Sequence, residues 1–293
     1  MQFLNPRTDF AFKKIFGSAK SKDILLSFLN AILGLSPEYR LTALTILDPY
    51  LAPKIAGMKD SYLDVRAEDQ SGKSYIIEMQ VLNVESFEKR ILYNACKTYA
   101  NQLSSAEGYH LLTDVIAVTI TNFVLFPEKD SIVSQFKLRG DDGEVYSDDL
   151  ELVFAELPKF VKTEDQLQSI IDKWLFFLKH ADDLSVIPQS LADEPAIVQA
   201  FDIANRASWT KRELEDQERN EIAIQDQRGA ISLAEKRAAA AAAIKAAAQA
   251  KIEEAQAIAI NLLRSGLLSD EQVSQIVTRL TLEQITALRL TLK

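Results

Sequence analysis

The amino-acid composition changes near residue 206, and this change sets the strongest limit on how the chain can fold. From there to residue 293 the sequence contains no proline and is dominated by Ala, Glu, Lys, Arg and Gln, with its densest alanine run at 238–250. Alanine has the highest intrinsic helix propensity, and proline is the residue that most strongly interrupts a helix. The sequence therefore predicts a long helix in this region.

The large apolar residues of this helix are too sparse and irregular for a coiled-coil heptad: Ile244, Ile252, Ile258 and Leu262. Because this pattern offers little against which the helix could fold back, we predict a homodimer formed through the C-terminal helices. Beyond Gly266, a repeat with a spacing of 12 residues, from Leu268 to Leu280, predicts two short helices, each opened by a Ser or Thr cap. As a helix-turn-helix, this pair would have only a few cations to contact DNA phosphates, namely Arg264, Arg279, Arg289 and Lys293. The pair is therefore expected to pack within the protein or to self-associate.

The first 160 residues show a different pattern, in which short extended runs alternate with amphipathic helical runs. The predicted helices span 9–17, 22–33 and 87–103, and the predicted strands span 41–47, 62–66, 74–81, 115–120 and 150–157. A further helix, at 165–179, follows this part. Strands interleaved with helices predict an α/β fold with a mixed sheet. We expect three parts, namely a core at 1–160, a helical extension at 161–205, and the long helix with a short helical tail at 206–293.

Each end of the first predicted helix has a residue suited to that position. Thr8 or Asp9 is expected to cap the amino end, because their side-chain oxygens can accept hydrogen bonds from free backbone amides. Gly17 is expected to end the helix, and Gly34 to stop the second one.

The predicted helix at 87–103 has two faces of different polarity. Four residues on one face are expected to pack on the core: Leu92, Cys96, Tyr99 and Leu103. Four polar residues share the opposite face: Arg90, Asn94, Lys97 and Asn101. Cys96 is the sole cysteine, so it is expected to be a small buried side chain rather than part of a disulfide.

The charge of the chain is unevenly distributed. The net charge is −9, yet residues 1–100 contain 13 Lys and Arg against 11 Asp and Glu, which gives +2 and leaves −11 for the rest. Nucleic-acid binding relies on cationic side chains, so contact with a polyanion is expected in the first third of the chain. No run of about 18 uncharged apolar residues occurs, and the first residues lack the order of a secretion signal. We therefore predict a cytoplasmic protein that does not bind membranes.

The extended runs at 62–66 and 74–81 are separated by a turn-rich segment and are predicted to form a hairpin. If the turn is centred near Ser71, Asp64 falls opposite Glu78, with Cβ atoms about 5 Å apart. Two like charges in this arrangement destabilise a sheet unless a cation neutralises them. Mg²⁺ prefers such oxygen ligands, and the backbone carbonyl of Met79 could add another.

These residues stand in blocks that resemble a known family. Asp64 followed by Glu78-Met-Gln80 resembles the PD-(D/E)XK nuclease motif in a form with glutamine as its last residue. Other blocks around it, TDFAFKKIFG at 8–17, YIIEMQ at 75–80 and ITNF at 120–123, resemble the recombination-promoting nucleases and transposase-like proteins of that superfamily. The similarity is clearest over about the first 160 residues.

The resemblance implies an α/β/α nuclease core, with Mg²⁺ or Mn²⁺ held by Asp64, Glu78 and the carbonyl of Met79. It implies DNA endonuclease activity linked to recombination, mobile elements or phage defence. Gln80 stands where many members of the superfamily have lysine. Glutamine does not exchange a proton near neutral pH, so Gln80 is expected to orient water or contact a phosphate while the metal activates the water.

Six side chains are candidates for contact with DNA: Lys13, Lys14, Arg66, Arg90, Asn94 and Lys97. For the two lysines of the first helix and the three residues of the helix at 87–103, a solvated helix face is the alternative. A second functional class remains open, a catalytically inactive DNA-binding or oligomeric adaptor on the same fold. A third, a transposase with three catalytic acids, needs another acid with a recognisable context. The later candidates do not have one: Asp114, Asp141, Asp142 and Glu156.

Overall fold

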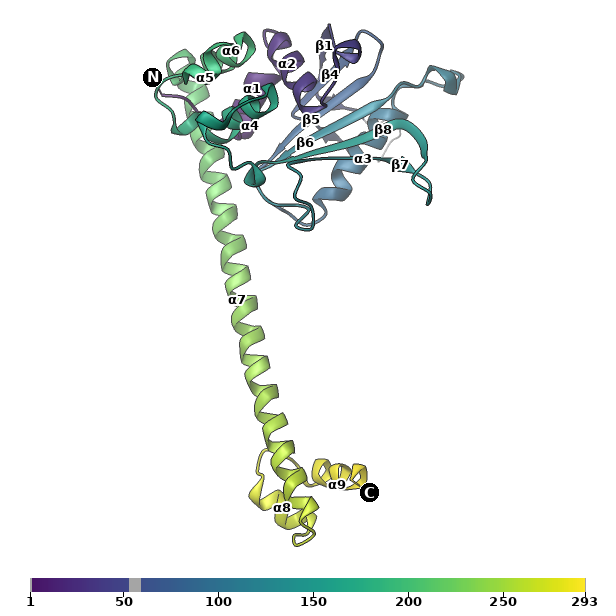
Figure 1. The fold of residues 1–293 in the computed structure, drawn as a ribbon, viewed down its shortest axis with the longest axis vertical. Coiled ribbons are helices and arrows are strands. Elements are labelled where there is room, and N and C mark those ends of the chain that lie inside the picture. The colour runs from purple at the N-terminus through teal and green to yellow at the C-terminus, as the bar shows by residue number, and fades with distance from the viewer. Residues whose placement is uncertain (1, 53–58, 293) are drawn as a thin grey trace. The chain divides into compact units, whose positions relative to one another are not determined.

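The computed structural model describes residues 2–52 and 59–292 (Figure 1). The chain divides into two compact units, Met1–Gln225 and Asp226–Lys293. Within the first unit, the described strands form a six-stranded sheet in the order β1-β4-β5-β6-β8-β7. These strands span Leu44–Leu47 (β1), Val65–Asp69 (β4), Ser74–Gln80 (β5), Val115–Thr121 (β6), Val133–Arg139 (β7) and Val145–Glu156 (β8). A small separate ladder joins β2 (Tyr50–Leu51) to β3 (Ser61–Tyr62).

The sheet is mixed, as the sequence predicts. β1, β4 and β5 pair antiparallel, β5, β6 and β8 pair parallel, and β7 returns antiparallel along β8. All of β6 is buried, which confirms that this strand is covered on both faces. β7 is an element that the sequence pattern did not predict, since its burial is irregular and several of its residues are exposed.

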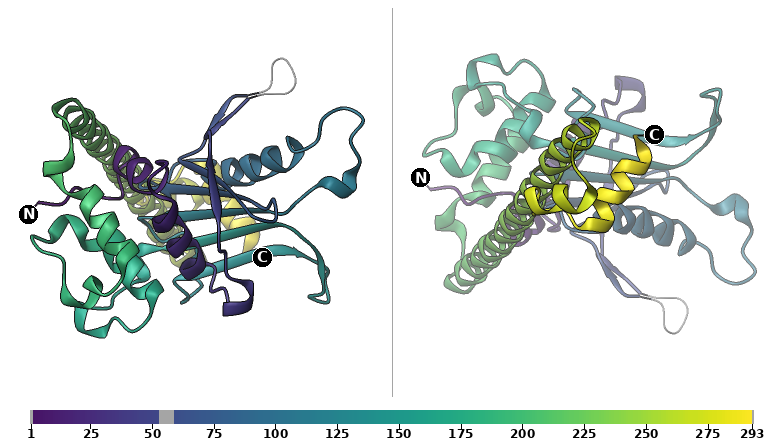
Figure 2. Two further views of the ribbon diagram at one scale, coloured as in Figure 1. Left: turned by 90° about the horizontal axis from the view of Figure 1, so that it is seen from above. Right: turned by 90° about the horizontal axis from the view of Figure 1, so that it is seen from below.

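Alternate residues of the central strands enter different apolar clusters, because strand side chains alternate between the faces of a sheet. Tyr75, Ile77 and Met79 belong to a large cluster with α1 (Asp9–Phe16) and α2 (Lys22–Ile32). Ile76 belongs to a second cluster with α3 (Phe87–Ala100) on the other face. The views in Figure 2 show α1 and α2 lying across the strands. These layers are the predicted α/β/α core.

The helices that follow the sheet extend the larger cluster. They span Ile170–His180 (α4), Gln189–Ala192 (α5) and Pro195–Ala204 (α6). α4 begins at Ile170, later than predicted, because Ser169 forms a reciprocal capping box with Asp172. Trp174 and Phe177 of α4 and Phe201 of α6 are buried in the cluster that also contains α1 and α2. Residues 161–205 therefore contribute to the same core as the first helices.

Two predictions about α1 and α3 are wrong. Thr8 occupies the cap position of α1, but its hydroxyl donates to the carbonyl of Asn5 and to Gln217 Oε1 instead of capping the helix. α3 buries a different face from the predicted one, since Ile91 and Ala95 are buried while Leu92 is 49% exposed. Cys96 is also exposed.

The physical reason for the rotation of α3 is that two of its polar side chains have partners inside the protein. Asn94 Nδ2 donates to Glu78 Oε1 at 2.9 Å. Lys97 Nζ donates to the backbone carbonyls of Leu51 and Lys59 at 2.9 and 2.6 Å. Buried polar groups are tolerated when they are hydrogen-bonded, so this face of α3 can be buried despite its polarity.

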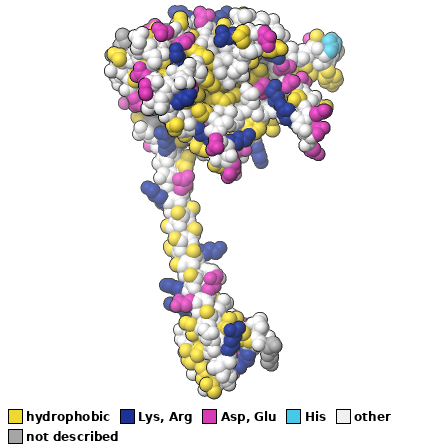
Figure 3. Space-filling view, viewed as in Figure 1, with side chains coloured by type: hydrophobic (Ala, Val, Ile, Leu, Met, Phe, Trp, Pro, Cys, Tyr) yellow, Lys and Arg dark blue, Asp and Glu magenta, His cyan; other side chains and the backbone are white. Residues whose placement is uncertain are grey.

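The long helix is confirmed as α7, Lys211–Arg264, and the two tail helices as α8 (Asp270–Ile276) and α9 (Leu282–Thr291). The alanine run at 238–250 is exposed throughout, and Figure 3 shows hydrophobic side chains interspersed with Lys, Arg, Asp and Glu along α7. Both tail helices begin with capping boxes, Ser269 with Gln272 and Thr281 with Gln284, as their sequences predict.

The tail helices fold back on the end of α7, contrary to the expectation that this helix has little to pack against. Ala259 and Leu263 of α7 are buried with Val273 of α8 and Ile285 of α9. Arg289, one of the cations considered for DNA contact, pairs instead with Asp270 and donates to the carbonyl of Leu268. Lys293 lies outside the described residues.

Candidate metal centre of a nuclease

Asp64 lies on a bend between two strands. β3 ends at Tyr62, which pairs with Tyr50 of β2, and β4 begins only at Val65. The predicted single strand over 62–66 is therefore wrong, and residues 62, 64 and 66 do not share the face of one strand. Gly17 at the end of α1 lies close to this bend, since a Cβ there would be 3.6 Å from the carbonyl oxygen of Asp64 and 3.3 Å from Val65 Cγ2.

The predicted register of the hairpin is confirmed. β4 and β5 pair with Val65 opposite Ile77 and Arg66 opposite Ile76, and one further step places Asp64 level with Glu78. Asp64 Oδ2 accepts a hydrogen bond of 2.9 Å from the backbone N–H of Met79. The carboxyl group thus takes the place of a strand partner where β4 has not yet begun.

The carbonyl of Met79 points to the same side as its N–H. In an antiparallel ladder, one residue directs both groups toward the same neighbouring strand. Asp69 N–H donates to the carbonyl of Lys73, so hydrogen-bonded positions of β5 recur at Tyr75, Ile77 and then Met79. Strand geometry therefore directs the carbonyl oxygen of Met79 toward the side on which Asp64 lies.

Burial dominates the electrostatics of Asp64. Its side chain is 15% exposed, and desolvation raises its pKa to about 7. The positive charge of Lys13 and the Met79 hydrogen bond act in the opposite direction, whereas the charges of Asp9 and Glu78 raise the pKa further. A cation at this position would remove the cost of ionising the carboxyl group.

Desolvation also outweighs the opposing interactions at Glu78 on β5. Burial raises its pKa, and the hydrogen bond from Asn94 together with the charges of Arg90 and Lys13 only partly offsets that effect. Asn94 is 5% exposed, so α3 holds one oxygen of Glu78 from a rigid position in the core. The sequence had suggested Asn94 as a contact for DNA, but the structure shows that its amide supports Glu78.

Gln80 is held at the end of β5 by both ends of its amide. Its Nε2 donates to the carbonyl of Leu82 at 2.8 Å, and its Oε1 accepts from Arg90 at 2.7 Å. Arg90 also lies over the ring of Phe87, 5.5 Å from its centroid. Gln80 and Arg90 are therefore brought together beside Glu78.

The two lysines of α1 have different surroundings. Lys13 Nζ lies 2.7 Å from Asp9 and 3.4 Å from Asp64, which places it at the site. Burial lowers the pKa of Lys13, but these two carboxylates outweigh that effect and the pKa is raised. Lys14 instead pairs with Glu213 at 2.6 Å and lies over the ring of Trp209, so it is not brought to the site.

Lys97 and Arg66, which the sequence also predicts to contact DNA, have different surroundings. Lys97 is 5% exposed, and its ammonium group is held by carbonyls of the segment around β2 and β3, away from solvent. Arg66 lies on β4 opposite Ile76, on the face that carries Glu78. Its Nε is buried and has no hydrogen-bond partner among the described residues. Arg66 thus has a donor that no described residue satisfies, whereas the ammonium group of Lys97 is held within the protein.

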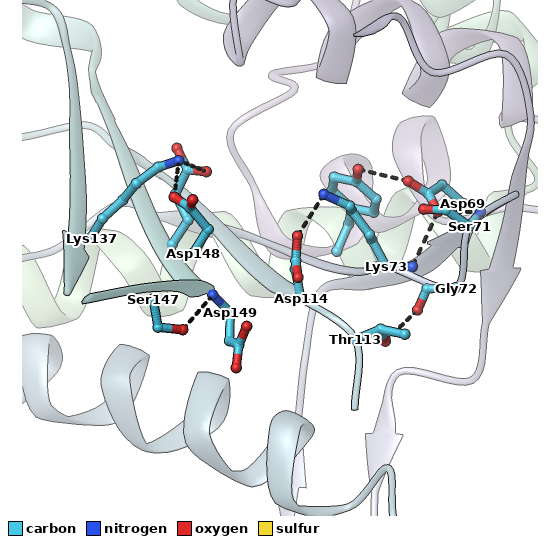
Figure 4. A network of polar contacts seen from close by, with 12 residues as sticks. Asp69, Ser71, Gly72, Lys73, Thr113, Asp114, Lys137, Ser147, Asp148 and Asp149 are labelled. Atoms are coloured by element: carbon cyan, nitrogen blue, oxygen red, sulfur yellow. Dashed lines mark hydrogen bonds and ion pairs between the residues drawn. The ribbon is translucent and has the colours of Figure 1, made fainter. Parts of the chain in front are cut away.

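The acids considered for a three-acid transposase lie elsewhere. Asp114 precedes β6 at the opposite end of the sheet, and its carboxylate pairs with Lys73 at 2.5 Å (Figure 4). Glu156 is fully buried, where it accepts from the N–H groups of Leu125 and Phe126 and pairs with Lys159. Asp142 accepts from its neighbour Glu144 N in the exposed turn between β7 and β8.

Comparison with known families gives one match, to the PD-(D/E)XK nuclease family transposases, over residues 6–234. The chain belongs to this family. Comparison with curated proteins and with solved structures gives no significant match. The PD-(D/E)XK match begins just before α1 and extends into α7, so it includes the sheet and every residue of the site described above.

PD-(D/E)XK nucleases generally use divalent metal ions, and the donor set of this chain fits such an ion. Two buried carboxyl groups and a backbone carbonyl are hard oxygen ligands, which Mg²⁺ and Mn²⁺ accept together with water. Across the described residues, no group of three or more His, Cys, Asp and Glu side chains is arranged to hold a metal. The donor set therefore does not correspond to a closed structural zinc site.

No helix within the described parts of the chain is both long and apolar enough to cross a membrane.

Proposed function

We propose that this protein is a Mg²⁺-dependent DNA endonuclease, with Mn²⁺ as a substitute, which hydrolyses phosphodiester bonds within DNA. The observation that carries the proposal is that the carboxyl group of Asp64 accepts from Met79 N–H at the level of Glu78, with both carboxyl groups largely buried and their pKa values raised by desolvation. A buried carboxyl pair without full compensation costs stability, and binding a cation removes that cost.

The roles of the residues follow from their positions. Asp64, Glu78 and the Met79 carbonyl would hold the ion. When bound, it supplies Lewis-acid polarisation of the phosphate and makes water easier to deprotonate. Gln80 carries no titratable group, so its amide orients the attacking water or contacts a phosphate oxygen. Asn94 keeps Glu78 in place from α3.

We propose that two cations, Lys13 and Arg66, contact the phosphate. Lys13 lies 2.7 Å from Asp9 and 3.4 Å from Asp64, so its ammonium group is held beside the proposed metal ligand, where it would contact a phosphate oxygen. Arg66 supplies the buried donor that lacks a protein partner. Guanidinium and ammonium groups stabilise the charge of a phosphodiester during cleavage.

The family's description as transposases supports a substrate of DNA and a role in recombination, mobile elements or phage defence. We also propose a homodimer through the C-terminal helices. Several large apolar side chains of the second unit remain exposed, including Leu267 at 84%, Leu290 at 66% and Ile276 at 58%. Measurement of the mass in solution tests the dimer, and a monomer at all concentrations would contradict it.

The test of the nuclease is a nicking assay on supercoiled plasmid with Mg²⁺, comparing the parent protein with Asp64→Ala and Glu78→Ala. Both variants should lose activity, whereas Asp114→Ala at the opposite end of the sheet should retain it. Equal nicking by all four proteins would remove the proposed site. Retained DNA binding by a parent protein that cleaves with neither Mg²⁺ nor Mn²⁺ would instead identify an inactive adaptor on the same fold.

A further inference from the structure

A groove of about 490 Å³ lies beside the carboxyl pair, between the first turns of α3 and the segment that carries β3. Two of its lining residues belong to the site, since Asn94 binds Glu78 and Arg90 binds Gln80. Through these two residues the groove adjoins the carboxylate and amide at the end of β5, where the scissile phosphate is expected. Its volume lies within the range of pockets that hold small organic ligands.

Two tyrosine rings form exposed surfaces of this groove. Tyr62 is 73% exposed, and Tyr93 of α3 is 37% exposed. The ring of Tyr62 packs on that of Tyr50, with centroids 4.9 Å apart, and the hydroxyl of Tyr50 donates to Asp60 at 2.9 Å. Tyr50 thus packs on one side of the Tyr62 ring, and the other side of this ring can receive a planar ligand.

The groove also carries charges suited to a phosphate chain. Lys59, Lys89 and Arg90 line it, against the acids Asp60 and Glu85. Three cations against two acids give the lining a net positive charge. The first turn of α3 also lines the groove, and the amino end of a helix favours anions.

The backbone at the start of α3 adds an independent observation. Ser86 lines the groove with φ at 65°, in the left-handed region that non-glycine residues rarely occupy, and its side chain makes no capping hydrogen bond. Such strain persists where the surrounding structure holds it, and it is concentrated at ligand-binding sites.

We infer that this groove binds an unpaired nucleotide next to the scissile phosphate, with its base stacked against both Tyr62 and Tyr93. This inference rests on the proposed function and names its substrate class, which is DNA with single-stranded nucleotides beside the cut. Bases in a continuous duplex are already stacked on their neighbours, so they are not available to a tyrosine ring unless they leave the helix. Unpaired bases stack readily on aromatic side chains, whatever their sequence.

The experiment compares cleavage of a continuous duplex with cleavage of the same duplex containing a short unpaired stretch. The proteins are the parent, Tyr62→Ala, Tyr93→Ala and Tyr62→Phe, with Tyr146→Ala as a matched control. Tyr146 is 86% exposed but lies on β8, outside the residues that line the groove. The parent and control should prefer the unpaired substrate, each alanine variant should lose about tenfold on it, and Tyr62→Phe should keep the preference.

A second readout separates this inference from the nuclease proposal. The fluorescence of 2-aminopurine in the unpaired stretch reports base stacking without metal and without cleavage. It should change with the parent and with Tyr146→Ala, and much less with Tyr62→Ala or Tyr93→Ala. Equal cleavage of both substrates by the parent, or alanine variants that keep its preference and fluorescence change, would overturn the inference. Absence of cleavage with an intact fluorescence change would reject only the nuclease.

Discussion

Carboxyl groups at the two ends of the central sheet have pKa values shifted in opposite directions. Near the end of β5, Asp64 and Glu78 are largely buried, and their pKa values are raised because hydrogen bonds and nearby cations do not offset desolvation. At the far end, shown in Figure 4, Asp148 pairs with Lys137 at 2.8 Å, and this hydrogen bond lowers the pKa of Asp148.

Other acids at the far end are also satisfied within the protein. Asp114 pairs with Lys73, and Asp149 accepts from the hydroxyl of Tyr99 at 2.6 Å. That hydrogen bond raises the pKa of Tyr99 to about 12. The difference teaches that the acids at the far end are balanced by partners in the chain, whereas the partners of Asp64 and Glu78 do not offset desolvation. Four predictions can break or sharpen this comparison.

The largest effect is expected from pH. Burial raises the pKa of Asp64 to about 7, and the group must be ionised to hold a cation. At limiting Mg²⁺, nicking should therefore fall about tenfold for each pH unit below that value. Added Mg²⁺ should move the midpoint to lower pH, because metal and protons compete. Initial rates across a pH series test this, and a midpoint that does not respond to Mg²⁺ would argue against Asp64 as a ligand.

The next largest effect is expected for Asn94 of α3, and a substitution of Tyr99 on the same helix serves as the control. Asn94→Ala removes the hydrogen bond that lowers the pKa of Glu78, so the rate should fall about 10–100-fold and the pH profile should move upward. Tyr99→Phe removes the bond to Asp149 at the far end and should leave the profile unchanged. Rate profiles of the two variants provide the measurement. If both variants lose activity alike, α3 acts only through general stability.

A smaller effect concerns stability without metal. The pKa of Asp64 is about 7 in the folded protein and 3.8 in its ordinary state, so the folded protein holds the extra proton between these values. Stability contributed by this group therefore falls as pH rises through that window. Asp64→Asn should raise the Tm at about pH 8 by several degrees, at about 2–4 °C per kcal/mol.

Thermal unfolding in the presence of a chelator measures this change. Asp114→Asn, which breaks the ion pair with Lys73, serves as the control and should leave the Tm unchanged or lower it. An Asp64→Asn variant that is less stable than the parent at alkaline pH would contradict the assignment of unbalanced charge to this end of the sheet.

The smallest effect is expected at Lys137, whose side chain is 29% exposed and pairs with Asp148 and Glu151. Lys137→Ala should change the free energy of unfolding by less than about 1 kcal/mol, because exposed ion pairs contribute little and are screened by salt. Urea denaturation at low and high salt measures this change. A large loss of stability or of nicking would show that the far end is coupled to the site.

Much of the fold could be predicted because the responsible signals are local. The register of β4 and β5 follows from the turn, in which Asp69 Oδ1 accepts from the N–H groups of Ser71 and Lys73 and Gly72 has φ of 87°. The all-apolar run of β6 indicated burial on both faces. The capping boxes at Ser269 and Thr281 marked the starts of the tail helices.

The errors arise where distant partners decide the outcome. α3 has two plausible apolar stripes, and the buried one is selected by Glu78 and by the carbonyls of Leu51 and Lys59. Likewise, Lys13 and Lys14 are adjacent and identical in type. Lys13 faces Asp64, whereas Lys14, on another side of α1, faces Glu213 and Trp209.

The sequence by itself determined the alternation of strands and helices, the long C-terminal helix, and the pair Asp64 and Glu78, because propensity, turn chemistry and period-two spacing act over a few residues. The tertiary structure alone decided that Asp64 lies on a bend bonded to Met79 N–H, that Asn94 supports Glu78, and that a tyrosine-lined groove adjoins them. Desolvation and hydrogen bonding between distant segments exist only after the chain has packed, so local sequence signals could not specify them.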